Sequence, residues 1–335
     1  MVTSQTSATQ TEARLPVLSS VPPLRIVFFG TPAFAVPSLD ALIAARPHQV
    51  VGVVTQPDRP RGRGLSVTPP EVKVLAQRHG LPVLQPDKVK VPAFEQALRA
   101  LNPDLIVVAA YGRILPRAIL ELPPHGCINV HASLLPRHRG AAPIAWAILA
   151  GDHTTGVTTM NMAEEMDAGD MLLQRATPIG PEETGGELTV RLAALGADLM
   201  VETLDALRAG TLRPRPQADA DVTYAPRIDQ AQRRIDWKRP AEELARLVRA
   251  LSPAPSAFTT LGSKRLKVFR ARPDGATATA APGTVVATGG GRLVVATGRG
   301  SLELLEVQLE GRRRLPAAEF LVGHPVAART CLGSA

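Results

Sequence analysis

The stretch Leu24-Arg25-Ile26-Val27-Phe28-Phe29-Gly30-Thr31-Pro32 indicates the fold class of this 335-residue chain. Apart from Arg25, residues 24–29 form a continuous apolar run of strand length, and Gly30-Thr31-Pro32 leads into a helical pattern over 34–46. A strand without polar alternation is buried on both faces, which is typical of a parallel sheet covered by helices. The sequence therefore predicts an α/β fold that starts at residue 24.

The same alternation of apolar runs and helical patterns continues for almost 200 residues. The order of the elements indicates βαβ units, followed by a hairpin and by a long helix that opens on the capping box Thr184-x-x-Glu187. Further strands are predicted at 50–55, 105–110, 127–131, 157–162 and 171–178, and helices at 71–79, 92–101 and 184–208. We read residues 56–69, rich in Pro, Gly and Arg, as a loop.

The pattern changes after residue 209. Residues 210–226 are rich in proline and lack periodicity, which predicts a linker. Beyond them one helix is predicted at 240–251, and glycine-rich turns separate short strands at 266–270, 284–287, 292–296 and 301–308. Short strands of this kind favour a small antiparallel β-barrel of the OB type. We therefore expect a disordered extension at 1–22, a domain at 23–209, a linker at 210–228 and a basic domain at 229–335.

Charge separates the two predicted domains. The formal net charge is +8, yet the first 225 residues are close to neutral and the remaining 110 carry about +9. A basic module attracts polyanions such as nucleic acid, although a merely well-solvated surface has the same composition. The sequence has no uncharged apolar run of about 18 residues that could span a membrane, and its two cysteines form no metal or redox motif. These features predict a cytoplasmic protein.

Polar residues gather at one predicted strand end. Asn129 and His131 lie two apart on a strand, so they project from the same face near the carboxyl end, where parallel sheets open their ligand crevice. A lone histidine there is more often a buried, hydrogen-bonded core residue. Asp167 lies in a glycine-containing turn between two later strands and could reach back to the imidazole. An amide, an imidazole and a carboxylate together supply the proton acceptor and the oxyanion donor that acyl transfer needs.

Several motifs along the chain follow one another in a fixed order and spacing: Gly30-Thr31-Pro32, Gln56-Pro57-Asp58-Arg59-Pro60, Ala110-Tyr111-Gly112, Ile128-Asn129-Val130-His131-x-Ser133-Leu134-Leu135-Pro136, Arg139-Gly140-Ala141-Ala142-Pro143 and Asp167-x-Gly169-Asp170. Together, from about Leu24 to the end of the chain, they resemble the methionyl-tRNA formyltransferase family.

The resemblance implies a Rossmann-like formyltransferase domain with a parallel sheet, followed by a small OB-like antiparallel β-barrel domain. It implies transfer of a formyl group from 10-formyltetrahydrofolate, as cosubstrate, to the amino group of methionine on initiator methionyl-tRNA, for translation initiation and without a metal. The family's catalytic trio corresponds here to Asn129, His131 and Asp167. Its folate-binding segment corresponds to Ser133, Leu134, Leu135 and Pro136, and we expect Leu134 and Leu135 to wall the pteridine. We expect a monomer.

The same resemblance implies where tRNA is bound. The loop at 56–69 corresponds to the family's insertion against the acceptor end, with Arg61 and Arg63 as its basic residues. The loop departs from the family in one respect, because Leu65-Ser66-Val67 stands where other members carry lysines. In the C-terminal domain the basic residues expected to contact tRNA are Lys264, Arg265 and Lys267, and strand parity places Arg265 and Lys267 on one face.

Other functions fit the sequence less well. His125, Cys127 and His131 share strand parity, but no fourth ligand has suitable spacing for a metal. Gly30-Thr31-Pro32 is not the dinucleotide fingerprint, which disfavours a nicotinamide cofactor. Two rivals remain: a formyltransferase for a small amine or nucleotide, and an RNA-binding protein with a catalytically dead domain. The basic C-terminal module argues against the first, and the intact polar trio argues against the second.

Overall fold

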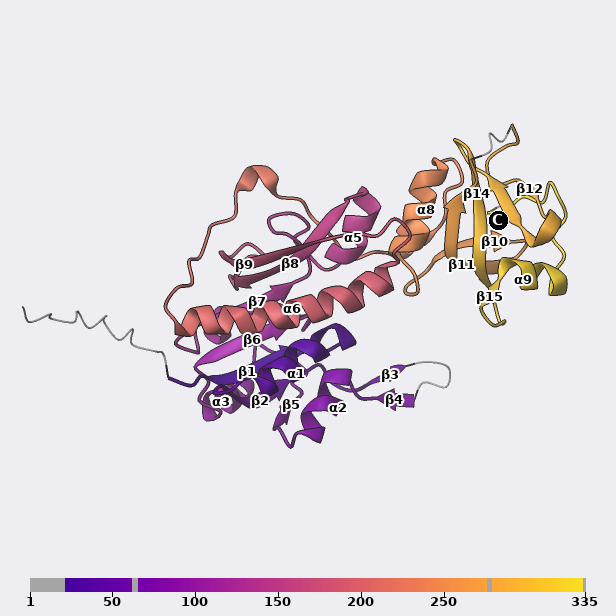
Figure 1. The fold of residues 1–335 in the computed structure, drawn as a ribbon. Coiled ribbons are helices and arrows are strands. Elements are labelled where there is room, and N and C mark those ends of the chain that lie inside the picture. Colours follow the sequence, from indigo (N-terminus) through magenta and orange to yellow (C-terminus); the bar gives the residue numbers. More distant parts are fainter. Residues whose placement is uncertain (1–21, 62–65, 276–278, 334–335) are drawn as a thin grey trace, which may run out of the picture.

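The computed structural model describes residues 22–61, 66–275 and 279–333, so the predicted disordered extension at 1–22 lies almost entirely outside the described residues. The described chain forms two parts, each built on its own β-sheet and joined by residues 209–229 (Figure 1). In these described stretches, no helix has both the length and the apolar character needed to cross a membrane.

The N-terminal part is built on a seven-stranded sheet in the order β5-β2-β1-β6-β7-β8-β9. The first five strands run parallel, β8 runs antiparallel to β7, and β8 and β9 form the predicted hairpin. The predicted α/β class and parallel sheet are confirmed. The strands are β1 (Arg25–Gly30), β2 (Gln49–Val54), β5 (Val83–Leu84), β6 (Leu105–Ala109), β7 (Cys127–His131), β8 (Thr154–Asn161) and β9 (Met171–Pro178).

Alternation along β1 explains why this sheet is covered on both faces. Ile26 and Phe28 belong to one apolar cluster, which includes residues of α1, α2 and α6, and Val27 and Phe29 belong to another with residues of α3 and α4. All four side chains are fully buried, as an uninterrupted apolar strand requires. The helices of this part are η1 (Ala33–Ala35), α1 (Val36–Ala44), α2 (Glu71–Arg78), α3 (Pro92–Ala100), α4 (Arg117–Leu120), α5 (Pro143–Ala150) and α6 (Gly185–Arg208).

The long helix α6 begins as the sequence predicts. The Thr184 hydroxyl accepts from the Glu187 backbone N–H, and the Glu187 side chain accepts from the Thr184 N–H, which together make a capping box. Midway along the helix, Gly196 lets it approach the sheet, because a Cβ there would lie 2.8 Å from a Val130 methyl group. The helix thus supports β7 from beneath.

The region 56–69 differs from the predicted loop. It contains a short antiparallel hairpin of β3 (Arg59–Arg61) and β4 (Ser66–Thr68), whose connecting residues lie outside the described ones. Strands of three residues with proline in one of them have no periodicity that a sequence pattern could reveal. The two-residue strand β5 was missed for the same reason.

The C-terminal part is an antiparallel sheet in the order β10-β11-β14-β13-β12, with β15 paired to β14, so it is the half-barrel form of the expected OB-like domain. Register shifts at Val268, Arg270 and Ala271 let β11 bend around the core. Prediction missed β10, β15, α7 and α9. The elements are α7 (Gln230–Arg233), α8 (Ala241–Ala250), β10 (Ala257–Leu261), β11 (Lys264–Pro273), β12 (Val285–Ala287), η3 (Gly289–Gly291), β13 (Leu293–Ala296), β14 (Ser301–Leu309), β15 (Leu315–Pro316) and α9 (Ala317–Gly323).

The two parts touch where α5 and the start of α6 meet α8 (Figure 1). Gly186 donates its N–H to the Ser252 carbonyl, and the Arg249 guanidinium donates to the Gly180 carbonyl at 2.8 Å. Burial, and then the nearby Arg246, lower the pKa of Arg249. Gly185 is required at this contact, because a Cβ there would lie 2.3 Å from the Ala250 carbonyl oxygen, and Leu149 of α5 packs against the apolar cores of both parts.

Candidate active site

Strand β7 presents its polar residues on the face opposite the α6 core. Ile128 and Val130 point into that core, and Asn129 and His131 share the other parity. Asn129 pairs in register with Val108 of β6 and Met160 of β8, so it lies between two buried strands. Its side chain is half-buried and has no hydrogen-bond partner among the described residues. An amide held in this way is free to donate to a ligand.

His131 and Asp167 come together as the sequence predicts. Nδ1 of His131 lies 3.6 Å from Oδ2 of Asp167, and their side chains are only 6% and 16% exposed. The other ring nitrogen, Nε2, lies 3.0 Å from the His138 carbonyl oxygen. A carbonyl oxygen only accepts, so Nε2 carries a hydrogen. In the neutral ring the basic lone pair is therefore on Nδ1, beside the carboxylate.

Asp167 is held by the backbone of a separate loop. Its Oδ2 accepts the Gly140 N–H at 2.8 Å, and its own φ of 53° lies in the left-handed region that non-glycine residues seldom adopt. Gly140 is also required where it stands, with φ of +128° and an added Cβ only 2.7 Å from the Ala225 carbonyl oxygen. The loop containing Gly140 and the turn containing Asp167 thus fix one another over the end of β7.

A third segment closes over both loops. We call residues 214–226, between α6 and the C-terminal part, the strap. Arg215 exchanges two backbone hydrogen bonds with Met171, both of 2.8 Å. Arg139 donates its N–H to Thr223 and accepts from Ala225 at 2.8 and 2.7 Å. The strap is therefore paired near its start with β9 and near its end with the loop that precedes Gly140, although it contains little secondary structure of its own.

The predicted folate segment has two faces. Ser133 and Leu135 are buried, at 0% and 3% exposure, and the Ser133 hydroxyl donates to the Arg137 carbonyl at 2.6 Å. Leu135 packs in a small cluster with Met160 and Met171, so it has little surface left for a ligand, contrary to our expectation that it walls a pteridine.

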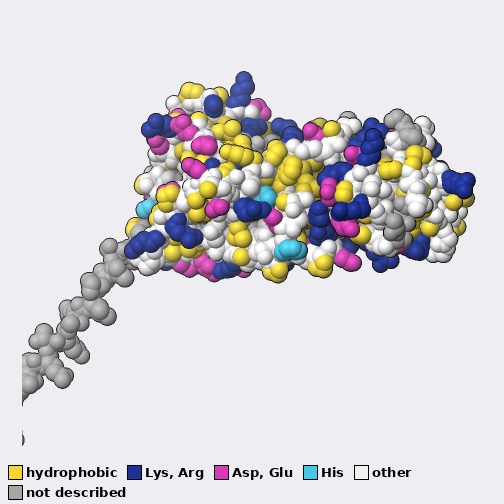
Figure 2. Space-filling view, turned by 90° about the horizontal axis from the view of Figure 1, so that it is seen from above, with side chains coloured by type: hydrophobic (Ala, Val, Ile, Leu, Met, Phe, Trp, Pro, Cys, Tyr) yellow, Lys and Arg dark blue, Asp and Glu magenta, His cyan; other side chains and the backbone are white. Residues whose placement is uncertain are grey.

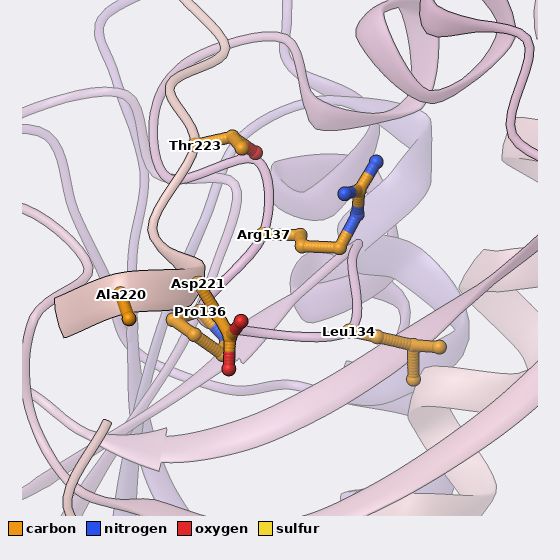
Figure 3. A pocket seen from close by; sticks show the side chains of 6 residues that line it. All are labelled: Leu134, Pro136, Arg137, Ala220, Asp221 and Thr223. Carbon is orange, nitrogen blue, oxygen red and sulfur yellow. The ribbon is translucent and has the colours of Figure 1, made fainter. Parts of the chain in front are cut away.

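Leu134 and Pro136 border an opening. They line a cavity of about 310 Å³ between this segment and the strap (Figure 3). In Figure 3 the Arg137 side chain lies between Thr223 and Asp221 of the strap, which also line the cavity. The remaining lining residue is Ala220.

Cys127 precedes the trio on β7 but takes no part in its chemistry. Its sulfur lies 3.7 Å from the carbonyl oxygens of Ile119 and Leu120, and burial raises the pKa of the thiol to about 12. It therefore remains a protonated, unreactive thiol at neutral pH. Within the described ranges, no group of three or more His, Cys, Asp and Glu side chains is arranged to hold a metal ion.

The hairpin β3–β4 has a polar root close to the sheet. Asp58 accepts from Lys73 of α2 at 2.7 Å and from Gln85 at 2.7 Å, and these hydrogen bonds, led by that of Gln85, lower the pKa of the Asp58 carboxyl. Gln56 donates to the Tyr111 carbonyl at 2.8 Å. Of the predicted tRNA-binding residues, Arg61 belongs to β3, and Arg63 lies outside the described residues.

The basic residues predicted in the C-terminal part lie on β11. Arg265 and Lys267 share a face, with Leu266 and Val268 buried on the opposite one, and Lys264 is exposed at the strand's start. The Arg265 guanidinium lies 4.6 Å from the centroid of the Phe258 ring on β10. Figure 2 shows one side of the whole molecule, on which Lys and Arg side chains are spread over both parts and interspersed with acidic ones.

Comparison with known proteins agrees with these features. Residues 24–204 match the family described as formyl transferase, and residues 227–325 match the family described as formyl transferase, C-terminal domain. Among solved structures, the chain is similar in fold to HypX from Aquifex aeolicus in complex with tetrahydrofolic acid (TM-score 0.60, 21% identity), covering 89% of this chain but about half, 47%, of that one. A second similar fold is WlaRD, a sugar 3N-formyl transferase, with a TM-score of 0.63 at 15% identity over 87% of this chain and 99% of that one.

The fold and the polar strand end thus define a formyl transferase. Two curated proteins named methionyl-tRNA formyltransferase are much more similar in sequence. That of Citrifermentans bemidjiense is 52% identical over 92% of this chain and 96% of its own, and that of Myxococcus xanthus is 53% identical over 90% and 96%. The chain belongs to the methionyl-tRNA formyltransferase family.

Proposed function

We propose that this enzyme moves a formyl group from 10-formyltetrahydrofolate to the α-amino group of methionine on initiator methionyl-tRNA. The observation that carries the proposal is the His131–Asp167 pair, 3.6 Å apart at the end of β7 on the strand that also holds Asn129, within a chain that is about half identical to proteins of that name. In this reaction a C–N bond forms between the amine and the formyl carbon, the bond from that carbon to N10 breaks, and the amine proton ends on N10.

Each side chain of the trio has a role that follows from its surroundings. Asn129, with its amide unpartnered, donates to the oxygen of the formyl group as negative charge develops there. Nδ1 of His131 is the nitrogen able to take the proton from the incoming amine, since Nε2 is committed to the His138 carbonyl. Asp167, 3.6 Å away, stabilises the imidazolium that results. The donor itself supplies an activated formyl carbonyl.

The folate segment contributes its shape more than its polar side chains. Thr158 accepts from the Leu135 N–H and donates to the Ser133 carbonyl, so the turn of residues 133–136 is fixed before any ligand arrives. The half-buried side chains of Leu134 and Pro136 are the part of it that a folate ring could contact, in a cavity whose other lining residues include the polar Arg137, Asp221 and Thr223.

The tRNA is proposed to bind across both parts of the chain. Arg61 of β3 and Arg63, which lies outside the described residues, serve the acceptor end, and Lys264, Arg265 and Lys267 on β11 serve phosphates further along the RNA. Low aromatic content, at 3% of residues, favours backbone and shape recognition over base stacking. In support of a division at 210–228, the two family matches end at 204 and begin at 227, and each part has its own apolar core. We further propose a cytoplasmic monomer.

A formyltransferase for a small amine is the second candidate, because the similar fold of WlaRD belongs to a sugar 3N-formyl transferase. The test mixes the purified chain with 10-formyltetrahydrofolate and either charged initiator or charged elongator methionyl-tRNA. Formylation confined to the initiator supports the proposal. Transfer to free amino sugars or nucleotides with no preference for tRNA would establish the second candidate instead.

A further inference from the structure

The side chain of Gln217, in the strap, lies between the two loops that hold the catalytic carboxylate. Its Nε2 donates to the backbone carbonyl oxygens of Asp167, at 2.7 Å, and Gly169, at 2.8 Å. Its Oε1 accepts from Nε of Arg139 at 2.9 Å. All three hydrogen bonds connect residues about 50 to 80 positions apart in the sequence. One amide thereby joins the turn of Asp167 to the loop of Gly140.

We propose that Gln217 is a positioning residue for formyl transfer, acting through Asp167 and resting on the function proposed above. Asp167 has a left-handed backbone conformation, which a non-glycine residue keeps only when its surroundings impose it. Gln217 supplies that constraint on the Asp167 carbonyl, while Gly140 holds the carboxylate of the same residue. The distance of Asp167 from His131 is thus set from both its backbone and its side chain.

We call the three hydrogen bonds of Gln217 the clamp, and Arg139 connects them to the loop that contains Gly140. Its side chain is 7% exposed, and its only carboxylate neighbour in the described chain is Glu165, at 3.9 Å and itself 74% exposed. A buried guanidinium needs acceptors, and the Gln217 oxygen is the close one. Arg139 directly precedes Gly140, so fixing it also fixes the N–H that binds Asp167.

The position of Gln217 gives the clamp a wider consequence. The residue lies at 217, between the family matches that end at 204 and begin at 227, in the segment that leads from the catalytic part to the basic part. Displacement of the strap when tRNA binds would therefore move Asp167 directly. Neither the sequence motifs nor the composition single out this glutamine.

Two substitutions separate positioning from simple support of the strap. Gln217→Ala removes all three hydrogen bonds. Gln217→Glu keeps an acceptor for Arg139 but turns a carboxylate oxygen toward the carbonyl oxygens of Asp167 and Gly169. Asp219→Ala, an exposed position in the same strap, is the matched control.

Steady-state kinetics with initiator methionyl-tRNA, run well below each variant's melting temperature, give the first readout. We expect kcat to fall about 10- to 100-fold in both Gln217 variants, as misplacing a reacting group by about 1 Å does, with each KM changed less than about threefold. Asp219→Ala should match the wild type. If Gln217→Glu keeps wild-type kcat, or if the loss lies only in KM for tRNA, the residue serves the strap alone and the proposal is overturned.

Hydrogen exchange gives a second readout that does not need activity. In the tRNA-free protein, the Gly140 amide should exchange at least about tenfold faster in both Gln217 variants than in the wild type, because its acceptor has moved. Unchanged Gly140 protection would reject the clamp even if the enzyme acts on another substrate. Conversely, a wild-type protein inactive on methionyl-tRNA but with the expected exchange pattern would reject the proposed function and leave the clamp standing.

Discussion

The catalytic strand end and the basic face of β11 differ in how their side chains are held: those at the strand end are buried and hydrogen-bonded, and those on β11 are largely exposed. Around His131 and Asp167, side chains are mostly buried and are held by backbone groups of His138 and Gly140, in a loop that contacts both. On β11, Lys264 and Arg265 are exposed on a strand whose other face packs in the core. Chemistry needs atoms fixed to within fractions of an ångström, whereas phosphate attraction acts over about 8–10 Å at ordinary salt. The first region requires long-range contacts, and the second requires only charge and a stable sheet.

The strap differs from both regions. Its composition predicts a flexible segment, but its contacts are long-range hydrogen bonds like those around His131 and Asp167. It resembles a flexible linker in its prolines and lack of periodicity, yet its backbone pairs with Met171 and Arg139 and its Gln217 side chain reaches the Asp167 turn. Stiffness here comes from neighbours and not from the segment itself. The following experiments change the two regions separately.

Asn129→Ala should have the largest effect, because it removes a donor from the rigid region. We expect kcat to fall about 10²–10³-fold, as when one oxyanion donor is lost, with little change in the affinity for tRNA. Single-turnover formylation of initiator methionyl-tRNA measures it, with Gln96→Ala on the exposed side of α3 as the control. Near-normal turnover would mean that Asn129 has no role in the mechanism. It would also reject the idea that catalysis depends on rigidly held donors at the end of β7.

How much of the rigid region the sequence predicts can be traced residue by residue. The period of two on 127–131 places Asn129 and His131 together, and a motif match brings in Asp167, because strand parity and family spacing are local signals. Arg139, Gly140 and Gln217 meet through the strap, which has no periodicity to predict its pairing. The hairpin at 59–68 is local, but its strands have only three residues each and one of them contains Pro60, so no periodicity identifies them in the sequence.

Replacing Lys264, Arg265 and Lys267 together by alanine should give the next largest effect, and only on tRNA. We expect kcat/KM for initiator methionyl-tRNA to fall about 10- to 100-fold near physiological salt, with kcat at saturation kept. The slope of log Kd against log salt should become shallower by about two, since each phosphate contact contributes roughly 0.7–0.9. Filter binding over a salt series measures it.

The triple variant has a clear contrary outcome. An unchanged salt slope would mean that these residues do not touch phosphate. A fall in kcat at saturating tRNA would mean that the two regions are not separable in this way. The matched control is the charge-neutral substitution Ser263→Ala in the preceding turn.

Lys73→Met should have a smaller effect, because it loosens the root of the hairpin and leaves its arginines in place. Lys73 donates to both oxygens of Asp58, at 2.9 and 2.7 Å, where the chain enters the hairpin. We expect KM for tRNA to rise about three- to tenfold, in line with ordering costs of about 1 kcal/mol, and KM for 10-formyltetrahydrofolate to stay constant. Lys88→Met, on an exposed loop, is the control. Equal rises in both KM values would indicate a general folding defect.

The smallest effect is expected at Glu303 on β14, where the C-terminal part fixes charges as firmly as the catalytic part does. Its carboxylate, 7% exposed, accepts from Arg292 at 3.0 Å and from Arg272 at 2.9 Å, and these hydrogen bonds, led by that of Arg292, lower its pKa. A carboxyl whose pKa is lower folded than unfolded stabilises the protein above the unfolded value, about 4.3, and loses that contribution as pH falls through the folded value. Glu303→Gln should therefore lower the melting temperature at pH 7 by about 2–4 °C, the equivalent of about 1 kcal/mol, and the gap should narrow as the pH falls below about 4.3. Thermal melts from pH 7 to pH 3, with exposed Glu319→Gln as the control, measure it. If the gap stays constant across this range, packing and not charge accounts for the difference in melting temperature. The C-terminal part would then lack a charged group held as firmly as Asp167 is held at the end of β7.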